Sequence, residues 1–503
     1  MTSFTAFDMT TSKPDLRGLA GLVAVDRRSA HPLRRQIYDS FRHRIIRQEL
    51  RAGELVPSSR LLARELRVSR LPVLNAYAQL LAEGYFESRV GSGTSVASSL
   101  PSSLRAAPKA SRNQTFVQGK RPVSERAQSL PPYERGDWAE NLGPFQVGQP
   151  DLHSFPMDLW SKLIARYSRQ MRVKGLQYGD PMGLPELREA IAGYLRTARG
   201  VRAEAGQIMI VSGSQQALDL TSRVLLDRGS PVWMEEPGYW LVRQALQAIG
   251  ARIVPVPVDA EGLNVGSGQK LSRKARAVFV APSHQYPLGV TMSATRRLQL
   301  LEWAQRVGAW IVEDDYDSEY RYESKPVASL QGMDRYDRVI YIGTFSKVMF
   351  PSLRLGYLVL PPDLVERFAA VRRAMDLCPS HIPQAVMFEF MREGHFARHL
   401  RRMRPIYAER RRTLVTALER EFGQKAEIMG DAAGMHLALL LKTPGNDQAI
   451  AARAAMQALW LSPLSASYAN PGRRCGFVLG FGNSRANQIG AALRQLKSLC
   501  FKQ

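Results

Sequence analysis

A segment without hydrophobic periodicity divides the chain into two parts of unequal size. Residues 99–142 are rich in Ser, Pro, Arg and Gln, which is the composition of a flexible linker. Residues 31–98 and 143–503 carry regular apolar patterns, and 503 residues exceed what one hydrophobic core usually holds. The sequence therefore predicts a small N-terminal domain tethered to a large C-terminal one. A flexible linker of this length spans roughly 35–40 Å, so the small domain can reach its own or a neighbouring subunit.

The charge of the chain favours anionic partners. Lys and Arg number 69 against 45 for Asp and Glu, a net charge of +24, which suits nucleic acid or an anionic membrane surface; a merely solvated basic surface is the alternative. The three cysteines form neither a disulfide framework nor a metal-binding spacing. The sequence has no run of 18 apolar residues, and its apolar stretch at 19–25 is short and lacks a convincing cleavage site. We expect a cytoplasmic protein without a membrane span.

The N-terminal domain has the apolar spacing of three helices followed by a hairpin. Apolar residues recur every four positions from Leu33 to Ile45, which places them on one helix face. Ser58 and Ser69 are each suited to cap a following helix, and these two helices form a helix-turn-helix. The glycine-rich turn after the last helix predicts a hairpin, or wing. We expect the two capped helices to bury Leu62 and Leu66, and Val73, Tyr77, Leu80 and Leu81, respectively.

The last helix leaves polar side chains at its N-terminal end, where a recognition helix meets base edges. Arg60, at the start of the preceding helix, is placed to reach a phosphate or a guanine. Outward arginines are often only solvated, so the spacing alone does not establish DNA binding. The candidate DNA-binding residues are Arg60, Ser69, Arg70, Asn75 and, in the wing, Gly91, Ser92, Gly93 and Thr94.

The amino-acid sequence of this domain supports DNA binding. The stretch GELVPSSRLLARELRVSRLPVLNAYAQLLAEGY followed by GSGTSV closely resembles the winged helix-turn-helix of GntR-type transcription regulators. Val56 stands where leucine usually precedes the Pro-Ser pair, and Arg67 stands where the turn usually has glycine. Neither change removes a presumed DNA contact, although arginine in a tight turn costs stability. The resemblance implies double-stranded DNA as a partner.

In the C-terminal domain short apolar strands alternate with amphipathic helices, which predicts an α/β sheet. The strand Ile208–Val211 runs into Ser212, Gly213 and Ser214 and then into a helix. A strand that ends in small residues at a helix N-terminus can hold a phosphate, because free backbone N–H groups and the helix dipole both face the anion. Many such turns use Gly and Ser for geometry only, so this signal gains weight only from the motifs further along the chain.

Two acids and a lysine occur at the ends of later apolar strands. AWIVEDDYDSEY places Asp314, Asp315 and Tyr316 at the carboxyl end of a strand, where open α/β sheets bind ligands. A metal site is the alternative, but no histidine or further carboxylate occurs at ligand spacing, and we expect no metal. Lys347 comes just after a second strand, between hydroxyl groups, where an amine can be held partly deprotonated.

A phosphate-binding turn, an acid and a lysine at a strand end are the three parts that hold pyridoxal 5′-phosphate. The turn binds the phosphate, the acid supplies a charge for the pyridine nitrogen, and the lysine amine bonds to the aldehyde. Residues 143–503 look like a fold-type I aminotransferase domain that binds this cofactor. The phrases GSQQALDL, EEPGYW, APSHQYPLG, EDDYDSEY and GTFSKVMFPSLRLGY are similar to those of the MocR/GabR family. Such regulators join a GntR-type DNA-binding domain to an aminotransferase-like domain.

The resemblance implies a role for each matching residue. Lys347 forms the internal aldimine, Asp314 pairs with the pyridine nitrogen, and Tyr316 hydrogen-bonds the ring oxygen. Tyr239 resembles the aromatic residue that stacks on the ring. Tyr178 in YGDPMG is similar to the tyrosine that reaches the phosphate of the partner subunit, which implies a homodimer with shared sites. The phosphate is held by Ser214, Gln215, Ser346 and Arg354.

Two departures from the aminotransferase pattern concern the ligand. Tyr286 stands where aminotransferases commonly carry the asparagine that bonds the ring oxygen, so His284 or Gln285 is expected to substitute. Val478 stands where many aminotransferases place the arginine that forks onto a substrate carboxylate. Arg473 or Arg474 is a candidate replacement. An α-carboxylate ligand is therefore doubtful, and other amines, amino sulfonates or the cofactor itself remain as effectors.

The sequence supports three hypotheses of function. The first is a transcription regulator that binds pyridoxal phosphate and senses it or an amine, with imine exchange at Lys347 shifting a two-state arrangement of its DNA-reading domains. The second is an active aminotransferase with a DNA-binding appendage. The third is a dimerisation platform that no longer binds the cofactor, against which intact Lys347 and Asp314 argue.

Overall fold

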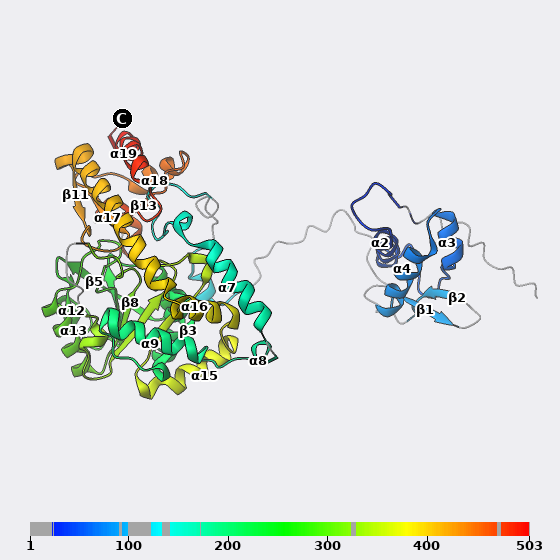
Figure 1. Cartoon of the computed structure of the whole chain (residues 1–503), viewed down its shortest axis with the longest axis horizontal. Helices are drawn as coiled ribbons and strands as arrows, with labels where there is room; N and C mark the ends of the chain where they lie inside the picture. Colours follow the sequence, from blue (N-terminus) through cyan, green and yellow to red (C-terminus); the bar gives the residue numbers. More distant parts are fainter. Residues whose placement is uncertain are drawn as a thin grey trace, which may run out of the picture. The chain divides into compact units, whose positions relative to one another are not determined.

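The computed structural model describes residues 23, 25–89, 93–98, 122–132, 141–171, 173–322, 328–469 and 474–501. The chain forms two compact units, Met1–Arg121 and Pro122–Gln503 (Figure 1). Each unit is described by itself.

Within its described residues, the N-terminal unit has three helices and a hairpin around one apolar core. Ser58 caps the second helix, because its hydroxyl accepts a hydrogen bond from the backbone N–H of Leu61 at 3.3 Å. At the centre of the core, the rings of Phe41, Tyr77 and Phe86 meet edge to face with centroids 5.2–5.6 Å apart. The elements are α2 (Leu33–Ile46), α3 (Ser59–Glu65), α4 (Arg70–Ala82), β1 (Phe86–Arg89) and β2 (Gly93–Val96). The unit is therefore a winged helix-turn-helix.

Three local features of this unit refine the prediction. Ser69 precedes α4, but its side chain makes no capping hydrogen bond. The prediction that Leu81 is buried was wrong, because this side chain is 38% exposed. Val73, Ala76, Tyr77 and Leu80 make the buried face of α4, and Leu81 lies about 100° around the helix from Leu80. Arg67 adopts a φ of 51°, the left-handed conformation for which glycine is favoured.

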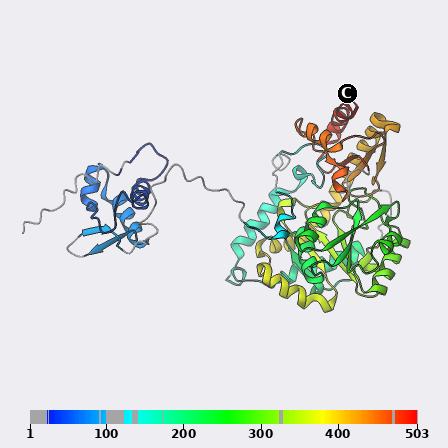
Figure 2. The same cartoon turned by 180° about the vertical axis from the view of Figure 1, so that it is seen from behind.

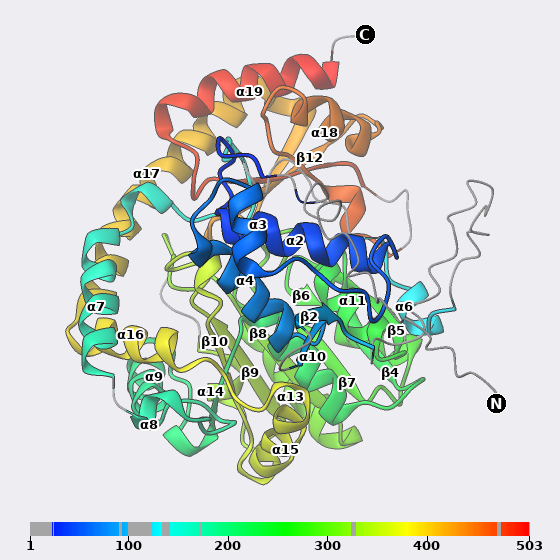
Figure 3. The ribbon, with the colours of Figure 1, turned by 90° about the vertical axis from the view of Figure 1, so that its right-hand side faces the viewer.

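The large unit is built on an eight-stranded mixed sheet with the order β3-β10-β9-β8-β7-β4-β5-β6 (Figure 3). Strands β9, β8, β7, β4 and β5 are paired in parallel, β10 is antiparallel to β3 and β9, and β6 is antiparallel to β5. The strands are β3 (Ile208–Val211), β4 (Pro231–Glu236), β5 (Arg252–Asp259), β6 (Gly262–Leu263), β7 (Ala277–Val280), β8 (Trp310–Asp315), β9 (Val339–Thr344) and β10 (Gly356–Val359).

Helices cover both faces of this sheet, because strand side chains alternate between the faces. On β7, Ala277 and Phe279 pack with α10 (Ser214–Leu225), α11 (Trp240–Ala248) and α15 (Val365–Asp376). Val278 and Val280 pack with α12 (Val265–Leu271) and α13 (Ala294–Val307). A third core joins β3, β9 and β10 to α7 (Met157–Gln170), α9 (Pro185–Arg199), α16 (His381–Arg392) and α17 (His395–Phe422). Among the described helices, none is both long and apolar enough to cross a membrane.

A smaller antiparallel sheet, with the order β11-β12-β14-β13, belongs to the C-terminal part of the chain. This part of the ribbon is coloured orange to red in Figure 2. Side chains of α17, α18 (Asp447–Ala455) and α19 (Ala486–Phe501) share its core. The strands are β11 (Ala426–Met429), β12 (His436–Leu441), β13 (Ser462–Pro463) and β14 (Gly476–Gly480). This sheet and the main sheet contribute residues to one cavity.

Part of the predicted linker belongs to the large unit. Residues 122–132 contain the short helix α6 (Glu125–Gln128), which is capped by the hydroxyl of Ser124. Glu125 forms an exposed ion pair with Arg228 at 3.1 Å, a contact of small energetic value. The remaining short helices are α8 (Val173–Leu176) and α14 (Leu330–Met333).

Candidate functional site

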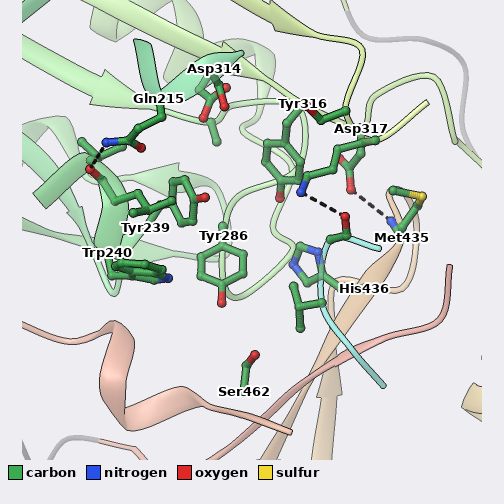
Figure 4. Close-up of a pocket in the computed structure, with 18 of the residues that line it drawn as sticks. Gln215, Tyr239, Trp240, Tyr286, Asp314, Tyr316, Asp317, Met435, His436 and Ser462 are labelled. Carbon is green, nitrogen blue, oxygen red and sulfur yellow. Dashed lines mark hydrogen bonds between the residues drawn. The ribbon is translucent and has the colours of Figure 1, made fainter. Parts of the chain in front are cut away.

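A cavity of about 1070 Å³ opens at the carboxyl ends of β4, β7, β8 and β9. This is the edge at which α/β sheets bind their ligands. Figure 4 shows its side chains, which come from both sheets. Eight residues predicted from the sequence line it: Ser214, Gln215, Tyr239, Asp314, Tyr316, Ser346, Lys347 and Arg354.

Lys347 lies just past β9, and its Nζ donates a hydrogen bond to the carbonyl oxygen of Gly148 at 3.1 Å. Burial lowers the pKa of Lys347 below its ordinary value, although the carboxylates of Asp317 and Asp314 act in the opposite direction. A lowered pKa increases the fraction of neutral amine, which is the form that attacks a carbonyl carbon. The environment therefore suits an amine that bonds to an aldehyde.

Asp314 and Asp315 are neighbours on β8 with different surroundings. The Asp315 carboxylate accepts hydrogen bonds from Arg199 and from the Tyr341 hydroxyl, each at 2.6 Å. Asp314 lines the cavity, and its Oδ1 is buried without a hydrogen-bond partner. Burial, together with the nearby charge of Asp315, raises the pKa of Asp314 to about 7. Asp315 is thus a structural ion pair, whereas Asp314 is available to a ligand.

The N-terminus of α10 and the guanidinium of Arg354 form a corner that is suited to an anion. Gly213 precedes the helix with a φ of 88°, and a Cβ at this position would lie 3.1 Å from Nη1 of Arg354. The Arg354 guanidinium donates to the carbonyl oxygen of Ser212 at 2.6 Å. A guanidinium beside free helix N–H groups is a favourable site for a phosphate.

Two tyrosines border the space between this corner and Asp314. Tyr239 precedes α11, and its ring meets that of Tyr286 at 5.3 Å with an interplanar angle of 70°. The Tyr316 hydroxyl donates to the backbone carbonyl of His284 at 2.7 Å. Both rings are therefore positioned by contacts within the large unit.

Other predicted residues lie elsewhere. Tyr178 is 85% exposed and does not line the cavity. Val478 is buried in a separate apolar cluster with Leu288 and Leu464. Arg474 is exposed and also does not line the cavity, while Arg473 is outside the described residues.

Gln285 and His284, which were expected to replace the missing asparagine, both make hydrogen bonds to other parts of the protein. The side-chain amide of Gln285 donates to the carbonyl oxygen of Pro237 at 2.8 Å and accepts from the Leu288 N–H at 3.1 Å. Nδ1 of His284 is hydrogen-bonded to Asp317 at 3.1 Å. Neither His284 nor Gln285 lines the cavity, so the expectation that one of them replaces the asparagine is not supported by the geometry.

Sequence reasoning missed several cavity residues. Glu235 is the second-last residue of β4, just before Glu236, and burial raises the pKa of Glu235 to about 8. The strand-end argument that identified Asp314 applies equally to Glu235. His436 begins β12, and the sequence offers no local signal that brings it to this cavity. Figure 4 shows His436 with Tyr286 and Asp317.

The structure also assembles three residues that sequence spacing does not connect. His284, Asp317 and His436 bring potential metal-ligand atoms within 4.8 Å of one another. The Asp317 carboxylate is already engaged, because it bonds His284 and accepts from the Met435 N–H at 3.0 Å. His284 and Asp317 are therefore a hydrogen-bonded pair, and the ring of His436 lies beside that of His284 with centroids 4.4 Å apart.

The residues present fit pyridoxal 5′-phosphate. Several cavity residues hold a buried side-chain polar atom without a partner, and buried polar groups normally have one, so these atoms suit a polar ligand. Asp314 and the corner at α10 match a pyridine nitrogen and a phosphate. The residues with such atoms are Gln149, Gln215, Glu235, Asp314, His436 and Trp460.

In the N-terminal unit, the predicted DNA-binding side chains lie at the surface. Arg60 on α3 and Ser69, Arg70 and Asn75 at the N-terminal part of α4 are exposed. Nε of Arg70 donates to the Ser59 hydroxyl at 3.2 Å, which links the two helices of the motif. Gly93 and Thr94 begin β2, whereas Gly91 and Ser92 are outside the described residues.

Both units match known families. Residues 33–96 match bacterial regulatory proteins of the gntR family, and residues 144–475 match aminotransferase class I and II. The probable rhizopine catabolism regulatory protein MocR of Rhizobium meliloti is 38% identical over 95% of each chain. The pyridoxine biosynthesis regulator PdxR of Corynebacterium glutamicum is 31% identical over 89% of this chain and 91% of its own.

Solved aminotransferases share the fold of the large unit. The kynurenine aminotransferase of Pyrococcus horikoshii, solved in complex with PMP, is 28% identical and superposes with a TM-score of 0.68 over 76% of this chain and 98% of its own. The α-aminoadipate aminotransferase LysN of Thermus thermophilus is 29% identical, with a TM-score of 0.65 over 71% and 91%. Because the relatives cover both units in one chain, this protein belongs to the MocR/GabR-type family, in which a GntR-type winged helix-turn-helix is joined to a class I and II aminotransferase domain.

Proposed function

We propose that this protein is a DNA-binding transcription regulator that holds pyridoxal 5′-phosphate on Lys347 and responds to the cofactor or to an amine. The observation that carries the proposal is that Lys347 and the unpartnered Asp314 Oδ1 face one cavity, which ends at the anion-binding corner of α10. An amine, an acid and an anion site in one cavity are what this cofactor requires.

Each part of the cavity has a role towards the cofactor. When bound, pyridoxal phosphate supplies an aldehyde that condenses with amines and a ring that withdraws electrons. Asp314 would hold the proton of the ring nitrogen. The Tyr316 hydroxyl, which donates to the His284 carbonyl in this structure, would donate to the ring oxygen instead. Tyr239 covers a ring face. The phosphate is held by Ser214, Gln215, Ser346 and Arg354.

We infer that the working form is a homodimer. Tyr178 is exposed on its own unit, which suits a side chain that serves the phosphate site of a partner subunit.

DNA binding rests on the winged helix-turn-helix. Exposed Arg60, Ser69, Arg70 and Asn75 contact the operator, and the wing adds contacts at Gly93 and Thr94. A ligand in the cavity changes operator binding only to the extent that its affinity differs between two arrangements of the protein.

An active aminotransferase is the second candidate, because the large unit shares the fold of solved aminotransferases and its cavity contains Lys347. That reaction needs a binding group for each carboxylate substrate. Sustained turnover of an amino acid with a keto acid would establish this activity.

The deciding experiment measures the cofactor and DNA binding together. Purified protein should take up pyridoxal phosphate with a visible absorbance band that borohydride reduction removes, and Lys347→Ala should abolish the band. Operator affinity should differ between cofactor-free and cofactor-loaded protein, and this difference should vanish in Lys347→Ala. An operator affinity that is identical in all these states would refute sensing.

A further inference from the structure

His436 is the imidazole among the cavity side chains that hold a buried polar atom without a partner. The residue is 3% exposed, lines the cavity, and its Nε2 has no partner among the described residues. The carbonyl oxygen of Pro287 accepts a hydrogen bond from the ring. Since a carbonyl oxygen only accepts and Nε2 is unbonded, the donor is Nδ1.

The imidazole is neutral in this environment. Burial lowers the pKa of His436 well below its ordinary value, and the nearby His284 and Lys347 lower it further. With the proton on Nδ1, Nε2 carries a lone pair and can only accept a hydrogen bond. Neighbouring rings hold the imidazole, with centroids 4.4 Å away in His284, 5.4 Å in Tyr286 and 6.4 Å in Tyr316.

The charges of the cavity argue against a carboxylate near His436. Among the described lining residues, the basic side chains besides His436 are Lys347 and Arg354. Arg354 lies at the α10 corner and Lys347 is the amine of the site, so neither is free to fork onto a second anion. Glu235, Asp314 and Asp317 line the same space. A carboxylate beside Nε2 would bring two acceptors together and lose its hydration without compensation.

We propose that His436 determines the class of effector: Nε2 accepts a hydrogen bond from a hydroxyl or N–H group of a small amine, so the cavity takes hydroxylated amines in preference to amino acids. The inference rests on the proposed binding of the cofactor at Lys347, because an amine is recognised there. It adds the chemical class of the ligand and identifies His436 as the residue that recognises this class.

The experiment uses the full-length, cofactor-loaded protein and matched probes. Ethanolamine is compared with ethylamine, and 3-amino-1-propanol with propylamine, so that each pair differs only by the hydroxyl and two chain lengths are covered. L-serine is ethanolamine with an added carboxylate. Binding is followed by the change in visible absorbance and independently by titration calorimetry.

The variants separate hydrogen bonding from packing. His436→Phe keeps a ring but removes the acceptor, and His436→Gln retains an acceptor oxygen. His399→Phe is the matched control, because His399 is also buried with an unpartnered ring nitrogen but lies outside the cavity lining.

In wild type and His399→Phe, at least one amino alcohol should bind about three- to tenfold more tightly than its alkylamine, the effect of one neutral hydrogen bond. L-serine should bind more weakly than ethanolamine. The hydroxyl preference should vanish in His436→Phe and persist in His436→Gln.

Equal affinity within both pairs in wild type, an undiminished preference in His436→Phe, or tighter binding of L-serine than of ethanolamine would each overturn the inference. If His436→Phe does not fold, the wild-type comparison and His436→Gln still decide. Failure of wild type to take up pyridoxal phosphate refutes the proposed function itself. Normal uptake without any hydroxyl preference refutes only the role of His436.

Discussion

Nζ of Lys347 lies 3.1 Å from the carbonyl oxygen of Gly148, a residue 199 positions earlier in the chain. Gly148 has a φ of 74°, and a Cβ there would lie 2.5 Å from the same Nζ. The absence of a side chain at residue 148 therefore leaves the space that the lysine amine occupies. A backbone segment far from Lys347 in sequence sets where the amine stands in the cavity.

Substituting Gly148→Ala should weaken cofactor binding by about tenfold or more, because the new methyl group displaces the lysine amine by more than a bonding geometry tolerates. The positive φ adds backbone strain of about 1 kcal/mol. Cofactor uptake is measured by the visible absorbance of the loaded protein. Gly179→Ala is the control, since a Cβ at Gly179 meets no atom within 4 Å. Unchanged affinity in Gly148→Ala would contradict the assignment.

The raised pKa of Asp314, about 7 in the folded protein, predicts a pH-dependent stability of the cofactor-free form. The unfolded chain loses this proton near pH 3.9, whereas the folded chain keeps it until about pH 7. Between these values the folded state binds more protons, so the free energy of unfolding falls as pH rises and levels off above pH 7. Asp314→Asn removes this contribution.

Urea unfolding at several pH values between about 4 and 8 tests this effect. The stability of Asp314→Asn relative to wild type should increase across this range by about 1–4 kcal/mol. Asp363→Asn changes an exposed carboxylate and serves as the control. Parallel pH profiles for wild type and Asp314→Asn would show that burial does not penalise the charge of Asp314.

Replacing Arg70 should affect sequence preference more than overall DNA affinity. If the guanidinium reads a base edge, Arg70→Ala loses about 1–3 kcal/mol of discrimination between operator and unrelated DNA. Fluorescence anisotropy over a range of salt concentrations separates the two contributions. Arg35→Ala on α2, where Arg35 pairs with Asp39 at 2.9 Å, is the control. Equal weakening on both DNAs would make Arg70 a phosphate contact.

The exposed position of Tyr178 predicts that it completes the site of a partner subunit. Tyr178→Phe should lower cofactor affinity about tenfold, because it removes a hydrogen bond to a charged group. A mixed dimer of Tyr178→Phe with Lys347→Ala should regain one tight site, since one site then contains both wild-type residues. The two variants carry different affinity tags, and bound cofactor is counted per purified mixed dimer. No tight site would form if Tyr178 acted within its own subunit.

Local sequence patterns predicted much of this protein correctly. The strand periodicity of β3, β8 and β9 and the small residues before α10 placed Lys347, Asp314 and Ser214 at or just past strand ends and at a helix start, where the structure has them. Such positions depend on neighbours in the chain. The same reasoning placed Ser58 as a helix cap. It misjudged Leu81, since the choice between adjacent apolar residues on α4 depends on the wing and α2 that pack against it.

The sequence by itself determined which elements form and which of their ends carry chemical groups, because periodicity, capping and turn preferences act between residues a few positions apart. Only the tertiary structure decided that Gly148 lies beside Lys347 and that Asp315 forms an ion pair with Arg199. It also decided that His436 of the second sheet lines the same cavity as residues of the main sheet. Those relationships join segments separated by more than a hundred residues. Their physical origin is the packing of helices, connecting segments and both sheets around shared apolar cores, which no local pattern records.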